Sequence, residues 1–199
     1  KWNKMCLEDG TLRLGYDGVP ADYRVELGKH PVFDFYRPQV KNDQTATSYA
    51  RQVHDFYAAG PETIWVTFFG DRLWWCQAKE PVEFISHDKE IASRYGSRLK
   101  RTVSGWSDCS VNGKIFYKDD ISGRLTQIAG FLGTICNVHP EVFDYLMRLI
   151  QDQKMPKLEK AEADKKSMLA SIEELLSDLT WKDFEILVDL IFSTSGWRR

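Results

Sequence analysis

The stretch that most constrains this chain is Thr63–Ala78, with the sequence TIWVTFFGDRLWWCQA. Its first half, Ile64–Phe69, consists almost wholly of β-branched and aromatic residues, which favour a pleated, well-buried strand. Gly70-Asp71 then predicts a tight type II′ turn, because that turn favours glycine at its first central position. A return strand follows over Leu73–Ala78. The stretch therefore predicts a β-hairpin at the centre of the fold.

Trp74 and Trp75 are adjacent in the second strand of this hairpin. Successive side chains of a strand point to opposite faces of its sheet, so the two indoles face opposite sides. One indole can fill a core, and the other needs a second apolar neighbour, a partner or a ligand. This additional aromatic surface is the first indication of function in the chain.

Length and composition limit the classes of function. The 199 residues are 43% hydrophobic, enough for one domain with a substantial appendage or for two small domains. No window approaches the roughly 18 apolar residues of a membrane span. A net charge of −2 argues against a generally basic nucleic-acid-binding chain, although not against a local basic patch. The four cysteines form no C-x-x-C pair, which favours free thiols in a reducing cytoplasm over a zinc site.

Helical patterns flank the hairpin. Thr45–Ala59 carries apolar residues at helical spacing, and Pro140 begins an amphipathic helix that closes the first domain. The composition then becomes charged, and apolar stripes return before and after Thr180, which with Asp183 fits a capping box. We predict an α+β fold with a small bent β-sheet or barrel, flanking helices and a helical tail. The predicted segments are a domain over 1–150, a helical linker over 151–179 and a further helical segment over 180–199.

The final residues, LTWKDFEILVDLIFSTSGWRR, contain Phe184-Glu185, an aliphatic stripe and then Gly196-Trp197. This arrangement resembles the opening helix and the Gly-aromatic turn of the Mrr-like restriction endonuclease domain. The resemblance implies that 180–199 begins a nuclease domain whose metal-binding carboxylates and lysine lie beyond Arg199. On that basis we expect no catalytic residue and no cofactor in this chain, and Mg²⁺ in the parent nuclease.

Residues 1–150 resemble the PUA-like superfamily, which includes EVE, YTH and SRA-type readers of modified bases. The likeness lies in the order of elements: an early strand end at Leu14-Gly15-Tyr16, the helix Thr45–Ala59, the aromatic hairpin, and a loop with Gly105-Trp106. It implies a small bent barrel that holds a flipped base between aromatic rings. A base reader followed by an Mrr-like nuclease is the arrangement of many modification-dependent restriction enzymes. The joint resemblance therefore implies a DNA-binding specificity module.

A base reader needs aromatic faces, polar groups at the base edge and contacts to phosphates. Each candidate also has a plainer role, in the core, in a turn or on a solvated strand edge. The base-binding candidates are Trp106, Trp75, Trp74, Tyr16, Ser107, Asp108 and Asn112. The phosphate-binding candidates are Arg98, Lys100, Arg101 and Arg51.

Two other interpretations remain open at this stage. The helical tail could pair with a partner or form a homodimer, which would make the chain a protein-interaction or oligomerisation module with tryptophan anchors. An RNA-binding PUA-like domain would differ from the first interpretation only in the type of nucleic acid. Modified DNA is the expected partner, and no membrane contact is expected.

Overall fold

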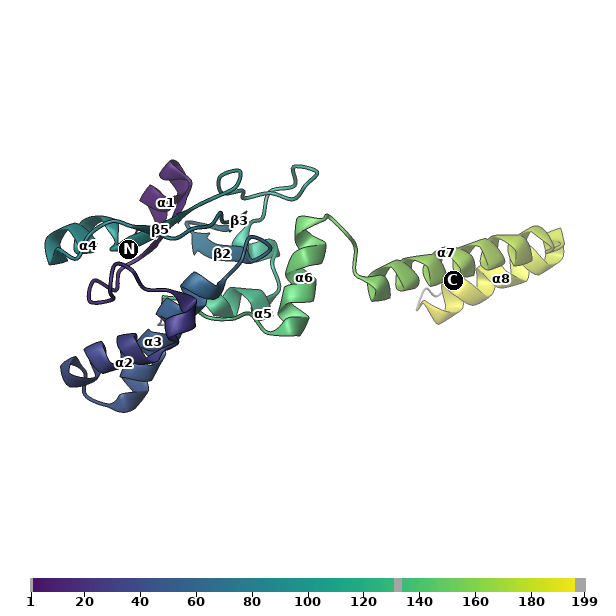
Figure 1. Ribbon diagram of the computed structural model, residues 1–199. Coiled ribbons are helices and arrows are strands. Elements are labelled where there is room, and N and C mark those ends of the chain that lie inside the picture. Colours follow the sequence, from purple (N-terminus) through teal and green to yellow (C-terminus); the bar gives the residue numbers. More distant parts are fainter. Residues whose placement is uncertain (1, 131–133, 196–199) are drawn as a thin grey trace. The chain divides into compact units, whose positions relative to one another are not determined.

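Figure 1 shows the computed structural model of the protein, which describes residues 2–130 and 134–195. The chain divides into two compact units, Lys1–Asp152 and Gln153–Arg199. The fold mixes helices with small, open antiparallel sheets, which confirms the α+β prediction at that level. Neither sheet closes into a barrel within the described residues, so the PUA-like barrel stays a prediction.

The predicted hairpin is present. Strand β2 (Ile64–Phe69) pairs antiparallel with β3 (Arg72–Gln77), with Ile64 opposite Gln77 and Phe69 opposite Arg72. Gly70, the first residue of the turn, has a φ of +64°, which a type II′ turn requires at that position. An L-residue with a side chain rarely adopts this conformation, so the glycine fixes where the chain reverses.

A second sheet lies beside the hairpin, in the order β1 (Thr11–Leu14), β5 (Arg98–Arg101) and β4 (Glu83–Phe84). All of its pairs are antiparallel. Isolated bridges from Ala78 to Thr102 and from Trp75 to Ser107 connect β3 to the chain that follows β5. The outer edge of β3 is therefore partly covered by these bridges.

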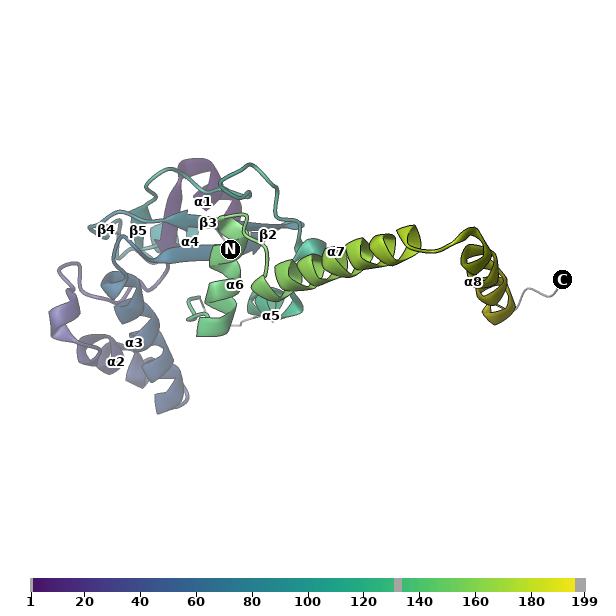
Figure 2. The same cartoon turned by 90° about the vertical axis from the view of Figure 1, so that its right-hand side faces the viewer.

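The hairpin lies between two apolar clusters. Alternation along β3 directs Leu73 and Trp75 into one cluster and Cys76 into the other. The helix α3 (Asp43–Ala58) contributes to the Cys76 side, and α2 (His30–Tyr36) lies beside it in Figures 1 and 2. The helix α6 (Pro140–Ile150) contributes Leu146 and Ile150 to the Leu73 side. Each face of the hairpin thus has a core of its own, which explains why β2 and β3 are apolar on both faces.

Local signals fix several helix ends. The helix α1 (Asn3–Asp9) ends at Gly10, which is left-handed with a φ of +63°. The helix α4 (Lys89–Tyr95) begins after Asp88, whose carboxylate accepts from the backbone N–H groups of Glu90 and Ile91. The remaining helices of the first unit are the short α5 (Gly123–Thr126) and the 3₁₀ turns Val25–Leu27, Arg37–Gln39, Lys118–Asp120 and Gln127–Gly130.

The second unit consists of α7 (Pro156–Ser177) and α8 (Trp181–Thr194). Thr180 and Asp183 form the predicted capping box at the start of α8. No residue of either helix is buried. Among the described residues, no helix is both long and apolar enough to cross a membrane. Residues 196 and 197 of the predicted Gly-aromatic turn lie outside the described residues.

The side chain of Arg98 ties the first unit together from within. Its exposed fraction is 0%, and no carboxylate among the described residues forms an ion pair with it. The five N–H groups of its guanidinium instead make five hydrogen bonds within the chain. Their acceptors are the hydroxyls of Tyr57 (2.6 Å) and Ser97 (3.1 Å) and the carbonyls of Tyr16 (2.8 Å), Val19 and Pro20 (2.8 Å).

We predict that Arg98→Met lowers the free energy of unfolding by about 3 kcal/mol or more, because buried carbonyls left unpaired cost about 1–3 kcal/mol each. Arg98→Lys should cause a smaller loss, since an ammonium retains three of the donors. Urea denaturation measures both, with Arg24→Met, an exposed arginine of the same region, as the control. A stability of Arg98→Met equal to that of the control would contradict the central role of this side chain.

Candidate nucleic-acid interface

Trp106, the leading aromatic candidate, lies just after Gly105, whose φ of +85° turns the chain at this point. Its indole is half-buried against the first cluster and donates to the Thr11 carbonyl at 3.0 Å. The residue lines two hollows: a cleft of about 820 Å³ that follows β2, and a smaller, more open pocket of about 420 Å³. The indole is thus anchored on one side and accessible beside two concave surfaces.

We call the smaller hollow the Trp106 pocket; its lining includes Leu7 to Gly10, Lys79, Arg101, Thr102, Gly105 and Trp106. Two of the predicted site residues, Trp106 and Arg101, therefore meet in one place. Lys79 joins them because its backbone N–H donates to the Arg101 carbonyl at 2.7 Å. Sequence reasoning missed Lys79, since only the pairing of residue 78 with residue 102 brings it there.

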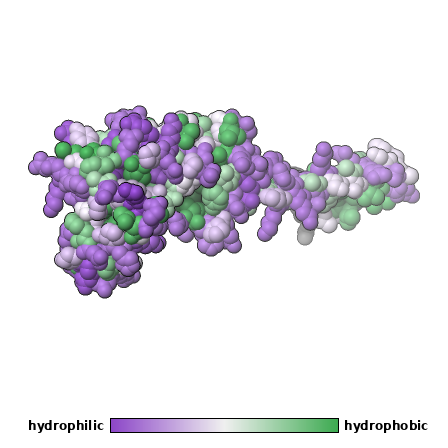
Figure 3. Space-filling view, in the orientation of Figure 1, coloured by the Kyte–Doolittle hydropathy of each residue, from purple (hydrophilic) through white to green (hydrophobic). Residues whose placement is uncertain are grey.

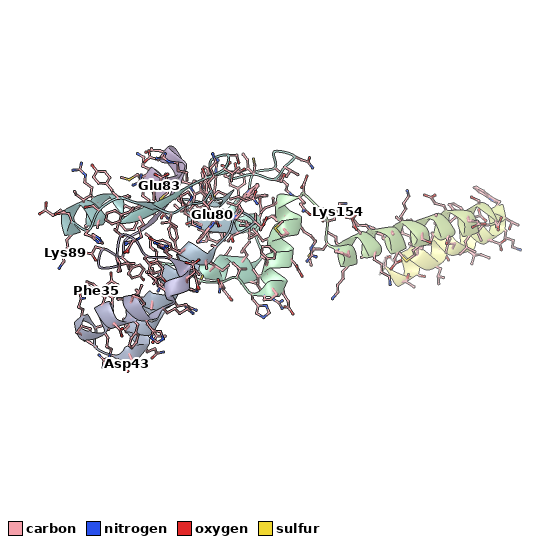
Figure 4. All side chains as sticks on the ribbon, viewed as in Figure 1. Phe35, Asp43, Glu80, Glu83, Lys89 and Lys154 are labelled. Atoms are coloured by element: carbon pink, nitrogen blue, oxygen red, sulfur yellow. The ribbon has the colours of Figure 1, made fainter. Side chains whose placement is uncertain are left out.

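Most charges around the Trp106 pocket are compensated. Arg101 makes a bidentate contact with Glu83, at 2.7 and 3.1 Å, and this glutamate is labelled in Figure 4. Asp9 accepts from Arg13 at 2.9 Å, and Glu8 lies 3.8 Å from Lys4. Lys79 is the lining cation that has no carboxylate partner among residues 2–130 and 134–195. Its ammonium, together with the donors of Arg101 that Glu83 does not engage, is available to an anion.

Three other candidates have structural roles. The indole of Trp75 packs in the second cluster and donates to the Cys109 carbonyl at 2.9 Å. Ser107 pairs with Trp75 as a β-bridge, and its hydroxyl donates to the same Cys109 carbonyl at 3.1 Å. Asp108 forms an ion pair with Arg72. These contacts close the loop onto β3, which is the turn-forming role that polar loop residues often serve.

Asn112 and Arg51 are exposed but lie away from the Trp106 pocket. The side-chain amide of Asn112 donates to Asp152 at 3.2 Å, and neither residue belongs to the pocket lining. Arg51 lies on α3. The structure therefore does not bring these two predicted contacts together with Trp106 and Arg101.

Tyr16 belongs to an aromatic cluster that packs against the first core. Its ring centre lies 5.7 Å from that of Tyr36 and 5.2 Å from that of Tyr49. Burial raises the pKa of Tyr16, and it raises the pKa of Tyr36 to about 12. Its ring and its carbonyl are both engaged within the chain, so the half-buried Tyr16 has a structural role beside the first core.

Arg98 and Lys100 correct the sequence prediction, because both side chains are buried and cannot reach a phosphate. All five N–H groups of Arg98 have acceptors within the chain. The Lys100 ammonium donates to the Ala59 carbonyl and lies 5.7 Å from the centre of the Phe56 ring. Burial lowers the pKa of Lys100, because a low-dielectric environment disfavours its charged form.

Trp74 differs from Trp75 in one respect. Its indole N–H is buried and has no acceptor among the described residues, as is also true of Trp65. An unpaired buried donor loses its hydration without compensation. Trp74 thus contributes to the hairpin through the packing of its ring and not through a hydrogen bond of its indole N–H.

Comparison with protein-family models, curated proteins and solved structures finds no match to this chain. Within the described residues, no group of three or more histidine, cysteine, aspartate and glutamate side chains could hold a metal ion. All four cysteines are free thiols. The functional argument therefore rests on the geometry of the chain itself.

We predict that Trp75→Phe destabilises the domain by about 1 kcal/mol more than Trp74→Phe does, because only the Trp75 change removes a hydrogen bond, the one from its indole to the Cys109 carbonyl. Both substitutions remove the same part of an indole, so each is the control for the other. Thermal unfolding with matched urea titrations measures the difference. Equal losses would show that the Trp75–Cys109 hydrogen bond contributes nothing to stability.

Proposed function

We propose that residues 1–152 bind DNA through the Trp106 pocket, as the specificity module of a modification-dependent restriction endonuclease. The observation that carries this proposal is the meeting of one indole, one guanidinium and one ammonium at a single open pocket. The proposal includes a flipped modified base as the ligand, a PUA-like relationship for the domain and a cytoplasmic location. The resemblance of 180–199 to the start of an Mrr-like nuclease domain supports it.

The chemistry of the pocket suits a nucleotide better than a neutral ligand. Stacking of one base on an aromatic ring contributes about 1–3 kcal/mol, which offsets part of the few kcal/mol lost on extruding the base. Lys79 and Arg101 then supply the phosphate contacts that give sequence-independent affinity. Because Arg101 is held by Glu83, its guanidinium is already oriented before a phosphate arrives.

We predict that Trp106→Leu weakens binding to the preferred duplex about tenfold, or about 1.4 kcal/mol, relative to Trp106→Phe. Both variants lose the hydrogen bond to Thr11, so they differ in the aromatic face alone. Fluorescence anisotropy would compare unmodified duplex DNA with duplexes that carry 5-methylcytosine, 5-hydroxymethylcytosine or N6-methyladenine, and with single-stranded RNA. Equal affinity of the two variants would remove Trp106 from the base site, and tightest binding to RNA would favour an RNA-binding domain.

The phosphate contact has a separate signature. Lys79→Gln should reduce the slope of log K against log salt by about 0.9, the contribution of one phosphate contact. Lys89→Gln is the matched control, because Lys89 is an exposed lysine outside the pocket lining and is labelled in Figure 4. A slope that both variants leave unchanged would place the phosphates elsewhere.

A specific observation also favours a second function, self-association through residues 153–195. The helix α8 is rich in large apolar residues, yet Trp181 is 77% exposed and Ile186 60% exposed. Figure 3 shows green, hydrophobic residues gathered on this unit. Large contiguous apolar surfaces mark sites of protein contact. We propose that a second copy of this chain covers the surface, with its α7 antiparallel.

The charges of α7 fit an antiparallel pair. Lys165-Lys166 precedes Glu173-Glu174 on the same helix, so reversal of one copy places each basic pair opposite an acidic pair. We predict a dimer by light scattering, which the double change Lys165→Glu and Lys166→Glu dissociates by repulsion of like charges. Adding Glu173→Lys and Glu174→Lys to those changes should restore the dimer. A chain that is monomeric at all concentrations would contradict this arrangement.

A further inference from the structure

The outer edge of β2 is the long edge of the hairpin that no strand of the described chain covers. The opposite edge, on β3, is bridged to residues 102, 107 and 117. An open strand edge presents unpaired N–H and C=O groups, and such an edge is a template for another strand. The groups that this edge presents follow from the pairing of the hairpin.

Three residues of β3 direct their backbone groups away from β2. The N–H of Leu73 donates to Phe116 at 3.1 Å, Trp75 exchanges two hydrogen bonds with Ser107 at 2.8 and 2.9 Å, and the carbonyl of Gln77 accepts from Val103 at 2.8 Å. In an antiparallel ladder, the two residues of a non-hydrogen-bonded pair direct their backbone N–H and C=O groups away from each other. The partner residue on the other strand therefore also presents these groups to its own outer edge.

The partners of these three residues on β2 are Phe68, Val66 and Ile64. Their N–H and C=O groups therefore point to the outer edge. The Phe68 carbonyl accepts from the side-chain amide of Asn3 at 3.4 Å. Within residues 2–130 and 134–195, the outward groups of Val66 and Ile64 have no hydrogen-bond partner.

The cleft of about 820 Å³ runs along this edge, because its lining includes every residue from Glu62 to Phe68. Apolar side chains of the lining, such as Trp65, offer contacts to alternate side chains of an added strand. Asp55 and Glu62 both line the cleft, Glu62 two residues before Ile64, and neither has a cationic partner among the described residues. The cleft therefore carries two carboxylates without an ion-pair partner in the part of the chain that the structure describes.

We propose that this edge accepts an extended segment of a separate polypeptide as an added β-strand. The segment carries apolar residues at alternate positions and a lysine or arginine that lies beside Glu62. A polypeptide fits better than a nucleic acid, because only another backbone offers donors and acceptors at the repeat of the outward groups of Val66 and Ile64. Trp106 lines both hollows, but Ile64, Val66 and Glu62 do not belong to the lining of the Trp106 pocket, and the proposal goes beyond the DNA-binding function proposed above.

The probe is a display library of random peptides about twelve residues long, selected on the intact protein and then synthesised. Anisotropy of the selected peptides compares Val66→Pro with Val66→Ala. The proline removes the outward N–H and leaves the hydrogen bonds of the hairpin in place, since proline is tolerated at an edge, whereas the alanine retains the N–H. We expect binding at least about tenfold weaker for Val66→Pro than for Val66→Ala.

Amide hydrogen exchange by NMR locates the peptide. In the free protein, the N–H groups of Ile64 and Val66 should exchange faster than those of Trp65 and Thr67, which face β3. Saturating peptide should protect Ile64 and Val66, and a peptide N-methylated at its pairing positions should not. DNA affinity measured on Val66→Pro should be unchanged, so that failure here is distinguished from failure of the Trp106 pocket.

Three outcomes would overturn the proposal. The first is a library without an enriched peptide that carries alternating apolar residues and a basic residue. The second is equal binding by Val66→Pro and Val66→Ala. The third is protection of the Ile64 and Val66 N–H groups from exchange in the protein alone. Protection that rises with protein concentration would mean that a second copy covers the edge. Protection independent of concentration would mean that the chain covers the edge itself.

Discussion

The buried guanidinium of Arg98 is the interaction on which the first unit depends. A charge without a carboxylate partner is tolerated inside a protein only when hydrogen bonds replace its hydration, and here every N–H has an acceptor. Four of the five acceptors are distant from Arg98 in sequence, on Tyr57 and in the segment from Tyr16 to Pro20. The guanidinium carbon also lies 5.4 Å from the centre of the Phe84 ring. One side chain thus joins β5 to α3, to β4 and to the loop after β1.

This arrangement leaves the two edges of the hairpin unequal. Residues 102 to 117 follow β5 and close onto β3, so their polar side chains satisfy the loop itself. The same closure brings Lys79 beside Arg101 and Trp106, which creates the Trp106 pocket. The edge of β2 has no equivalent cover among the described residues, and the larger cleft lies along it. Both concave surfaces are therefore consequences of how one hairpin is flanked.

Charge separates the two surfaces. At the Trp106 pocket the lining carboxylates have basic partners, whereas Lys79 has no carboxylate partner among the described residues, which favours an anionic ligand. In the cleft along β2, the carboxylates of Asp55 and Glu62 have no such partners among residues 2–130 and 134–195, which favours a basic ligand. A net charge of −2 conceals this local contrast. The two surfaces thus differ in the charge of the ligand that each favours.

The sequence alone determined the elements whose signals are local. It predicted the hairpin with its Gly70 turn and the capping box at Thr180, and it singled out Trp106, because each depends on residues a few positions apart. Only the tertiary structure decided which of the basic residues in the segment 98–101 are buried. Arg98 and Lys100 alternate onto one face of β5 and Arg101 onto the other. Which face is the core depends on partners as distant in sequence as Tyr16 and Tyr57, and no local pattern encodes contacts over that separation.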